Sequence, residues 1–387
     1  VHAALAVDAD VYEIWRFCVD DTTEILTRSG YKCYDDIKEG DETLTLNMET
    51  GFAEWQPILS VTSFEVTDEQ MLSVEAKGHS SLTTMDHRWP VLRTTGSFRG
   101  QHPDPKALLI SRSADLHAID RFIRAAPVID LPDAQKYSDH LVELMGWFIT
   151  EGHIHNRRGG GKYTSLNIAQ SHRVNPEKVM RIRMALTRVF GPGVDEFSTR
   201  KGKRSDRLPQ WRETISPCKP DMTLFRLNSV AGEVLCQLAP NKVATMEFIH
   251  SLTESQLRIF LGSCLSGDGH VRKDGYRSIV QNSVDRLVPI QIACTLLGIP
   301  TSLQAPTNTG ENRKSTRVLS LCEKNRYIAP LAQNRKNAEH VTYTGKVWCP
   351  TTGNGTWFAR RNNTTYFTGN CDNYHTVGYL GRAEQPA

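Results

Sequence analysis

The sequence predicts a mixed fold, with β structure at both ends of the chain and a basic α/β segment between them. Three observations indicate this: short β-prone runs before about residue 135, helical runs after it, and a charge that is positive in the middle and negative at the ends. The 387 residues are enough for two or three domains of roughly 100–200 residues each.

The first part of the chain contains short β-prone runs separated by turn-like glycine and aspartate segments, which indicates strands. These runs are Glu24–Thr27, Thr43–Asn47, Ile58–Phe64, Met71–Ala76 and Trp89–Arg93. From about Val341 the sequence returns to the same kind of run. We therefore expect both ends of the chain to be built from strands.

Two stretches in the middle of the chain are typical of helices. Leu141–Thr150 is an apolar stretch that ends at Gly152, and the basic run Pro176–Phe190 ends at Gly191. Proline near the start and glycine just after the end are expected at helix boundaries. The middle segment is therefore expected to contain helices as well as strands.

The net charge is only +3, but the charged residues are unevenly distributed. Between residues 138 and 335 there are 28 Lys/Arg and 17 Asp/Glu, whereas the remaining residues include 18 Lys/Arg and 26 Asp/Glu. Attraction to phosphate is the usual reason for concentrating positive charge in one segment, so the middle is a candidate for nucleic-acid binding. A solvated face with no ligand is the alternative.

The nine cysteines are scattered and include no C-x-x-C pair. This pattern argues against a disulfide framework and a zinc ribbon, and a reducing, cytoplasmic setting is the simpler interpretation. No segment reads as a membrane span, and Val1–Phe17 lacks the basic and apolar regions of a secretory signal. We expect no membrane partner.

A weak internal repeat places an acid after an apolar run twice in the middle segment. The copies are LMGWFITEGHIH (144–155) and FLGSCLSGDGHV (260–271), and their acids Glu151 and Asp268 lie 117 positions apart. This spacing suits two copies of one small subdomain. The small residues Gly146, Gly262 and Ser263 would let two helices pack closely and bring both acids together beneath a groove.

Paired carboxylates of this kind bind a divalent metal. Mg²⁺ held there can activate water and stabilise the leaving oxygen in phosphodiester cleavage. The alternative is that each copy is a helix ending in an ordinary acid and a glycine cap.

These motifs resemble those of the LAGLIDADG homing endonucleases over roughly Ser138 to Arg335. The resemblance implies an inserted α/β endonuclease of two pseudo-symmetric halves that cuts double-stranded DNA with Mg²⁺ as cofactor. It transfers the metal-binding role to Glu151 and Asp268. Lys242 is a candidate catalytic-site lysine by the same resemblance, with a surface lysine as the alternative. The second motif departs from the pattern at Ser266, where a second acid is common.

The two ends of the chain carry a different chemistry. The segments CVDDTTEILT, SSLTTMDHRWPVLRT, GKVWCPTT and TTYFTGNC supply Cys18, Thr84, His87, Trp89, Cys349, Thr368, Asn370 and Cys371. An asparagine amide can attack its own backbone carbonyl and cut the chain after itself, and a thiol can accept an acyl group as a thioester. Positioning can supply an effective molarity of about 10⁵–10⁸ M, and a histidine can protonate the departing amine.

Joined in this order, the motifs resemble those of inteins, whose splicing domain is an all-β horseshoe called the Hint fold. CVDDTTEILT, LTTMDH and TGNC match three separated motifs in the family order, over roughly Cys18–Asp133 and Lys336–Asn370. The endonuclease-like middle stands where many inteins have such an insertion. The resemblance implies single-turnover self-splicing that acts on the flanking host segments (exteins) in cis and needs no cofactor.

This resemblance divides the chain into five parts. They are an N-terminal extein fragment (1–17), two parts of the Hint domain (18–137 and 336–370), the endonuclease (138–335) and a C-terminal extein fragment (371–387). Splicing would excise residues 18–370 and join Phe17 to Cys371 by a peptide bond. The endonuclease would cut the intein-free host gene, and we expect a monomer.

His87 and Thr84 are expected near the Phe17–Cys18 bond, where His87 would supply a proton to the leaving amine. At the other junction, the residue before the last asparagine is usually a histidine in inteins, and here it is Gly369. Another group must then assist the cyclisation of Asn370.

A second departure concerns the first nucleophile. Trp89, Cys349 and Thr368 resemble the Trp-Cys-Thr signature of class 3 inteins, in which the internal cysteine attacks the upstream junction directly. Cys18 is also present, so the sequence supports two routes for the first step. We favour Cys349, with Trp89 packed close to the site and Thr368 positioning the junction.

Three other functions fit parts of the sequence. A freestanding homing endonuclease would act on DNA only and would not explain the β-rich ends. A Hedgehog-like Hint protein would cleave without ligating, which Asn370-Cys371 argues against because ligation needs both residues. A folded module with inactive sites would do neither. The mass of the expressed chain separates these alternatives from splicing.

Overall fold

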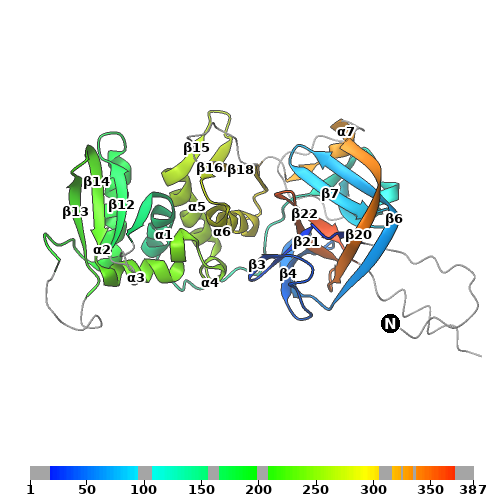
Figure 1. The fold of residues 1–387 in the computed structure, drawn as a ribbon, viewed down its shortest axis with the longest axis horizontal. Helices are drawn as coiled ribbons and strands as arrows, with labels where there is room; N and C mark the ends of the chain where they lie inside the picture. The colour runs from blue at the N-terminus through cyan, green and yellow to red at the C-terminus, as the bar shows by residue number, and fades with distance from the viewer. Residues whose placement is uncertain are drawn as a thin grey trace, which may run out of the picture.

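The computed structural model of the chain describes residues 18–94, 107–155, 165–197, 208–304, 316–323, 326–333 and 337–370. Both expected extein fragments, 1–17 and 371–387, lie outside the described residues. Figure 1 shows strands from both ends of the described chain on one side and paired helices with small sheets on the other. Among the helices described, none has the length and apolar character needed to cross a membrane.

The β region comprises the described residues between 18 and 128 and between 326 and 370, and its regular elements are mostly strands. These are β1 (Val19–Asp20), β2 (Glu24–Thr27), β3 (Gly30–Lys32), β4 (Glu42–Leu46), β5 (Ala53–Pro57), β6 (Ser60–Ala76), β7 (His79–Thr84), β8 (Arg88–Arg93), β9 (Leu108–Arg112), β10 (Asp120–Ile123), β19 (Tyr327–Ile328), β20 (Ala338–Thr351), β21 (Thr356–Arg361) and β22 (Thr364–Gly369). Two short helices, η2 (Ser113–Asp115) and α7 (Pro330–Gln333), lie among them.

Strands from the two ends of the chain pair with each other throughout the β region. β1, β20, β6 and β7 form a closed barrel, and β19, β10, β8 and β9 form a four-stranded sheet. In the barrel, β20 joins the first strand of the described chain to β6. Both end parts of the described chain therefore contain strands, as the sequence predicts, and neither part forms its sheets alone.

The longest strands of the β region, β6 and β20, pair along almost their whole length. The prediction of separate strands at Ile58–Phe64 and Met71–Ala76 is therefore wrong, because one strand spans Ser60–Ala76. The polar residues between the two apolar runs are held in the strand by pairing with β20. Strand formation depends strongly on such tertiary context, which the separate runs do not reveal.

The helical region consists of residues 139–321 and combines helices with two small sheets. Its elements are α1 (Asp139–Glu151), β11 (Gly152–His155), β12 (Ser165–Ser171), α2 (Pro176–Phe190), β13 (Trp211–Ser216), β14 (Lys219–Leu227), α3 (Ser229–Leu238), η4 (Pro240–Lys242), α4 (Met246–His250), α5 (Glu254–Asp268), β15 (Gly269–Val271), β16 (Arg277–Gln281), α6 (Val284–Leu296), β17 (Thr301–Leu303) and β18 (Arg317–Leu321).

The boundaries of the two predicted helices follow from local sequence. α1 begins after Ser138, whose Oγ accepts a hydrogen bond from the backbone N–H of Leu141 as an N-cap. α2 has Pro176 in its first turn and is followed by Gly191, whose φ of 82° favours glycine. Both helices therefore form where the sequence predicts them.

The same order of elements occurs twice in the helical region. α1-β11-β12-α2-β13-β14 has its counterpart in α5-β15-β16-α6-β17-β18. The strand order also repeats, with β11-β12-β14-β13 in the first sheet and β15-β16-β18-β17 in the second. Glu151 ends the first helix of one copy, and Asp268 ends the first helix of the other.

The two regions share a sheet and a hydrophobic core. Ser302 of β17 pairs with Thr364 of β22, which extends the second sheet of the helical region into a ten-stranded sheet that also contains β21, β2, β3, β4 and β5. The buried side chain of Arg124 donates to the carbonyl oxygen of Thr301 at 2.6 Å. One set of buried apolar side chains runs from Trp55 into α1, α5 and α6. The regions are therefore packed against each other.

The expected end of the endonuclease segment, at residue 335, does not match the strand pairing. β19 pairs with β10 of the β region, although residues 327–328 fall before that boundary. The last strand of the helical region in its second sheet is β18, which ends at Leu321. Pairing between segments so far apart in sequence leaves no local pattern from which this boundary could be predicted.

Candidate functional sites

Cys18 directly precedes β1, and its backbone is held on both sides by Thr84. The Cys18 amide nitrogen donates to Thr84 Oγ1 at 3.1 Å, and the Thr84 amide nitrogen donates to the Cys18 carbonyl oxygen at 3.0 Å. Thr84 ends β7, which pairs with β1. The structure thus brings Thr84 to the nitrogen atom of the Phe17–Cys18 peptide bond; Phe17 itself lies outside the described residues.

Cys349 lies on β20, the other neighbour of β1. The register pairs Val19 with Trp348, so its extension by one residue places Cys18 opposite Cys349. Directly opposite residues of an antiparallel pair have Cβ atoms about 4.5–5.5 Å apart. Both cysteines are buried in one apolar cluster. Backbone pairing therefore places a second thiol beside the upstream junction.

His87 connects the upstream motif to the downstream one. Its Nε2 lies 2.5 Å from Thr368 Oγ1, and its backbone N–H donates to the carbonyl oxygen of Thr84 at 3.1 Å. His87 and Thr368 are both fully buried. His87 is therefore linked through its backbone to Thr84, which holds Cys18, and through its imidazole to the strand that leads to Asn370.

The structure brings together two members of the Trp-Cys-Thr signature. The ring of Trp89 packs edge-on against His87 at a centroid distance of 5.2 Å, and its Nε1 donates to Ser113 Oγ at 3.0 Å. Thr368 is hydrogen bonded to the same imidazole. Cys349 belongs to a separate apolar cluster around Cys18. Among the candidate reactive residues, Trp89 therefore packs against His87.

Asn370 is buried and held through both its backbone and its side chain. Its amide nitrogen donates to the carbonyl oxygen of Gly355 at 3.0 Å, and its Nδ2 donates to the carbonyl oxygen of Thr352 at 3.1 Å. Both acceptors lie between β20 and β21. The amide nitrogen that would attack the backbone is therefore fixed by a turn of the same chain. Cys371 lies outside the described residues.

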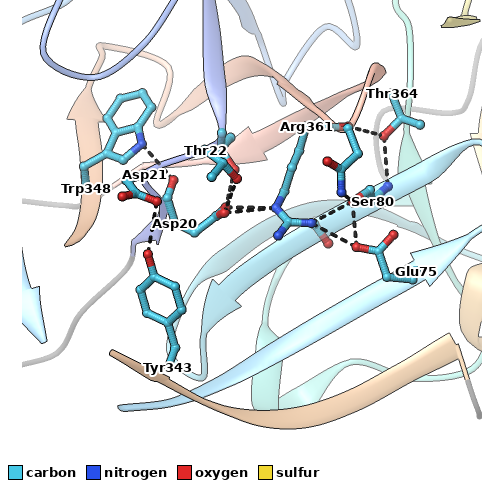
Figure 2. Close-up of polar contacts among 12 residues, drawn as sticks. Asp20, Asp21, Thr22, Glu75, Ser80, Tyr343, Trp348, Arg361 and Thr364 are labelled. Carbon is cyan, nitrogen blue, oxygen red and sulfur yellow. Dashed lines mark hydrogen bonds and ion pairs between the residues drawn. The ribbon is translucent and has the colours of Figure 1, made fainter. Parts of the chain in front are cut away.

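A buried ion pair ties the first strand to the hairpin that leads to Asn370. Figure 2 shows Arg361, at the end of β21, between Asp20 and Glu75. Arg361 Nε donates to the two carboxylate oxygens of Asp20 at 3.0 and 3.1 Å, and Nη1 donates to Glu75 Oε1 at 2.9 Å. Trp348 Nε1 donates to the Asp20 carbonyl oxygen at 3.1 Å. Asp20 and Arg361 are too far apart in sequence for any local pattern to pair them.

In the helical region, α1 and α5 pack so closely that the side chains between them must be small. A Cβ on Gly146 would lie 1.9 Å from Ser263 Oγ, and one on Gly267 would lie 2.1 Å from Thr150 Oγ1. The prediction that Gly262 lies in this contact is wrong, because a Cβ there would meet no heavy atom within 4 Å. Gly267 takes that role because it lies four residues after Ser263, on the same helix face.

Glu151 and Asp268 are the last residues of α1 and α5, and each is followed by a glycine. Gly152 and Gly269 have negative φ, so they do not make a left-handed turn. A Cβ at either position would instead lie 2.2 Å from the carbonyl oxygen four residues earlier. The glycine after each acid is therefore required for space.

Burial raises the pKa of both carboxyl groups above their ordinary values. The nearby Asp268 carboxylate raises the pKa of Glu151 further, and the hydrogen bond from Gln170 acts in the opposite direction. The charge of Lys242 partly offsets the effect of burial on the pKa of Asp268. Each carboxylate also lies at the negative end of a helix dipole. A site that disfavours two anions in this way is suited to bind a cation.

Lys242 is buried beside the acid pair, so the alternative of a surface lysine is wrong. Its Nζ donates to the carbonyl oxygen of Thr150 at 3.0 Å. Burial lowers the pKa of Lys242 to about 8, and the charge of Arg286 acts in the same direction. Lys242 and Asn241 both have positive φ, a strained conformation that is often found at functional sites.

Two glutamines that the sequence interpretation missed hold the two acids. Gln170 Nε2 donates to Glu151 Oε1 at 3.0 Å, and Gln281 Nε2 makes the corresponding bond to Asp268 Oδ2. Gln170 comes from β12 and Gln281 ends β16, the second strand of each copy. The signal was present as IAQS (168–171) and IVQN (279–282), two short segments with glutamine at the same place.

The donor set of the acid pair fits a hard divalent cation. Mg²⁺ binds oxygen ligands and is commonly held by one or two carboxylates together with water and substrate phosphates. Glu151 and Asp268 supply two partly buried carboxylates whose raised pKa shows that their negative charge is incompletely compensated. The residues present therefore fit Mg²⁺.

A row of polar and basic side chains crosses the first sheet of the helical region. Adjacent strands place the following residues opposite one another: His153, Asn167, Arg226 and Arg212. Their neighbours Leu166 and Leu227 are buried in the core, so the alternation of side chains puts the row on the opposite face. Basic side chains on such a face can contact the phosphate backbone of nucleic acid.

Comparisons with known proteins gave matches among solved structures. The homing endonuclease I-DmoI, in a structure of its mesophilic variants, matches 49% of this chain and 90% of its own, with 11% sequence identity and a TM-score of 0.33. A splice-inactive variant of the AceL NrdHF class 3 split intein matches 28% of this chain and 63% of its own, with 16% identity and a TM-score of 0.23.

A bacterial intein-like domain from Clostridium thermocellum matches 27% of this chain and 65% of its own, with 24% identity and a TM-score of 0.21. The match thus spans less than two thirds of each of these two intein structures. No protein-family model matches the chain, and no curated protein matches it. Among solved structures, the chain is similar to a homing endonuclease and to intein domains.

Proposed function

We propose that this chain is an intein precursor that excises residues 18–370 and joins Phe17 to Cys371 by a peptide bond. One observation carries the proposal: the amide nitrogen of Cys18, the leaving atom at the upstream junction, is held by Thr84, and Cys349 lies in the same buried cluster as Cys18. Asn370, the residue that would cut the downstream junction, is anchored in the same region. These groups come from distant parts of the sequence.

The first step transfers the N-terminal segment to a thiol. The Cys349 sulfur attacks the carbonyl carbon of Phe17, the bond to the Cys18 nitrogen breaks, and that nitrogen takes up a proton. His87 is the proton donor, and Thr84 holds the leaving nitrogen. An attack by Cys18 itself, as an N-to-S shift, is the second route. The register between β1 and β20 favours Cys349 because it supplies a thiol from the opposite strand.

The remaining steps exchange bonds without an external reagent. The Cys371 sulfur takes the acyl group from Cys349, which recovers its thiol. Asn370 Nδ2 then attacks the carbonyl carbon of Asn370 and forms a succinimide, while the bond to Cys371 breaks and its amine takes the proton. That amine attacks the thioester and forms the Phe17–Cys371 amide. Positioning is the main contribution of the fold, since it can supply effective molarities of about 10⁵–10⁸ M.

We also propose that the helical region cleaves double-stranded DNA in the intein-free host gene, with Mg²⁺ held by Glu151 and Asp268. When bound, the metal supplies an activated water and stabilises the leaving oxygen. Gln170 and Gln281 orient the two carboxylates. Lys242 holds or releases a proton near neutral pH beside them.

In this proposal the endonuclease is an insertion in the splicing domain. Residues 18–137 and 336–370 belong to the splicing domain, and strand pairing adds β19 to it, so the insertion ends soon after β18. The row that contains Arg226 and Arg212 would contact the DNA backbone. We propose a monomer that acts in the cytoplasm.

Mass spectrometry of the freshly expressed chain tests the splicing proposal. Splicing gives two products, the fragment 18–370 and a peptide that joins 1–17 to 371–387. A freestanding endonuclease or an inactive module leaves the 43.5 kDa chain intact. A Hint protein that only cleaves gives fragments without the joined peptide. An intact chain, or fragments without the joined peptide, contradicts splicing.

A further inference from the structure

Gly369, the residue before the last asparagine, has no room for a side chain. A Cβ at this position would lie 2.3 Å from the carbonyl oxygen of Arg88 and 2.8 Å from its Cβ. The carbonyl oxygen of Gly369 accepts a hydrogen bond from Trp357 Nε1 at 2.8 Å, which holds the strand in place. A histidine therefore does not fit at position 369, and a group that assists Asn370 must come from elsewhere.

The space beside Gly369 is occupied by Arg88, and the residue before Arg88 is a histidine. Arg88, whose backbone faces Gly369, directly follows His87 in the sequence. His87 Nε2 lies 2.5 Å from Oγ1 of Thr368, the residue before Gly369. The imidazole of His87 is therefore bonded to the last strand within two residues of the asparagine, in a site closed to solvent.

We propose that His87, through Thr368, positions Asn370 for cyclisation and so serves the downstream junction as well as the upstream one. This inference rests on the proposed splicing function. The hydrogen bond fixes the end of β22, while Thr352 and Gly355 hold the Asn370 amide groups from the other side. Asn370 Nδ2 is thereby kept in reach of its own carbonyl carbon when the bond to Cys371 breaks.

The arrangement links His87 to both junctions, through its backbone upstream and through its imidazole downstream. The carbonyl oxygen of Thr84 accepts the backbone N–H of His87, and the hydroxyl of Thr84 accepts the amide N–H of Cys18. The side chain of His87 points to Thr368 on the other strand. His87 is the proton donor proposed upstream and a positioning residue downstream.

The test measures downstream cleavage alone, in a full-length chain in which Cys18→Ala and Cys349→Ala block the upstream steps. In this background Thr368→Val and His87→Gln should each slow cleavage after Asn370 by about tenfold or more, the loss expected for one buried hydrogen bond. Thr368→Ser keeps the hydroxyl and should restore most of the rate. The double variant should be no slower than the slower single variant, because both remove one interaction.

Thr365→Val is the matched control, since Thr365 is a buried threonine on the same strand and has no assigned role in the reaction. It should cleave at the rate of the background chain. Equal slowing by Thr368→Ser and Thr368→Val, or unchanged rates in Thr368→Val and His87→Gln, would overturn the inference. The splicing proposal fails separately, if the unsubstituted chain yields no joined peptide or if Asn370→Ala does not stop downstream cleavage. Circular dichroism melting identifies any variant that is unfolded, and the remaining single variant then decides.

Discussion

The β region and the helical region hold their candidate reactive groups in opposite ways. In the β region, Cys18, His87, Cys349 and Asn370 are neutral or weakly ionising groups, and all are at most 2% exposed. In the helical region, the acid pair is only partly buried, and its burial raises both pKa values. Neutral groups can be closed off from water at little cost, whereas carboxylates cannot.

This difference matches where each proposed substrate comes from. The upstream and downstream peptide bonds are part of the chain, so the splicing site can be closed before the reaction. DNA and a cation come from solution, so the acid pair must remain accessible. The two sites are nevertheless in one packed structure, because β17 and β22 pair and the regions share a core. The predictions below test whether the sites act separately.

The largest expected effect is at the downstream junction. Asn370→Ala removes the only described side chain placed to cut the chain before Cys371, so cleavage at that bond should become undetectable. Upstream thioester formation should continue, since its groups are untouched. Gel analysis and mass spectrometry of the expressed variant measure both events. Release of the C-terminal segment at the unsubstituted rate contradicts the assignment.

An equally complete loss is expected for DNA cleavage in the helical region. Glu151→Gln and Asp268→Asn each remove one of two carboxylates for Mg²⁺ and should abolish double-strand cutting of the uninterrupted host gene. Splicing should proceed at the unsubstituted rate, because neither residue contacts the groups described at the junctions. Loss of splicing in both variants would show that the shared sheet makes the regions inseparable. The absence of cutting by the unsubstituted chain with Mg²⁺ means an inactive nuclease.

The two buried thiols distinguish the routes for the first step. Cys349→Ala should stop formation of the hydroxylamine-sensitive thioester, because its sulfur is the proposed first acceptor. Cys18→Ala should leave most of the thioester, since its main role is as the leaving amine. The reverse result assigns the first attack to Cys18 and leaves Cys349 with a structural role in the apolar cluster.

A smaller, graded effect is expected for the upstream proton donor. His87→Ala should slow cleavage at the Phe17–Cys18 bond by about 10²-fold or more, the usual loss of a general acid. The rate of thioester formation in a freshly purified chain is the measurement. A melting curve close to that of the unsubstituted chain shows that the fold is kept. An unchanged rate rules out this role.

The smallest expected effect is on stability in the helical region. Burial raises the pKa of Glu151 in the folded chain. The stability that the Glu151 carboxyl group contributes is therefore fully present below its unfolded pKa, and it is lost as the pH rises through the folded pKa. At neutral pH without divalent metal, Glu151→Gln should therefore raise Tm by a few degrees. Mg²⁺ should reverse this order by stabilising only the unsubstituted chain. A Tm difference that does not respond to Mg²⁺ or to low pH contradicts the cation site.

The sequence by itself determined the elements that depend on nearest neighbours. The helix Pro176–Phe190 is bounded by its proline and glycine, and the apolar run before Glu151 forms a helix with its own N-cap. The duplicated acid motif predicted the two helices that pack together. The order of the motifs near the two ends of the chain predicted the candidate thiols and the asparagine. These features are local because capping, periodicity and residue chemistry act over a few residues.

Only the tertiary structure decided how distant segments meet. It joined two predicted runs into β6, assigned β19 to the β region, and replaced Gly262 by Gly267 at the helix contact. It also paired Asp20 with Arg361 and linked His87 to Thr368. Strand register, close helix approach and buried hydrogen bonds depend on which surfaces face each other after folding. Local sequence patterns do not contain these contacts, because the contacts join segments that are far apart in the chain.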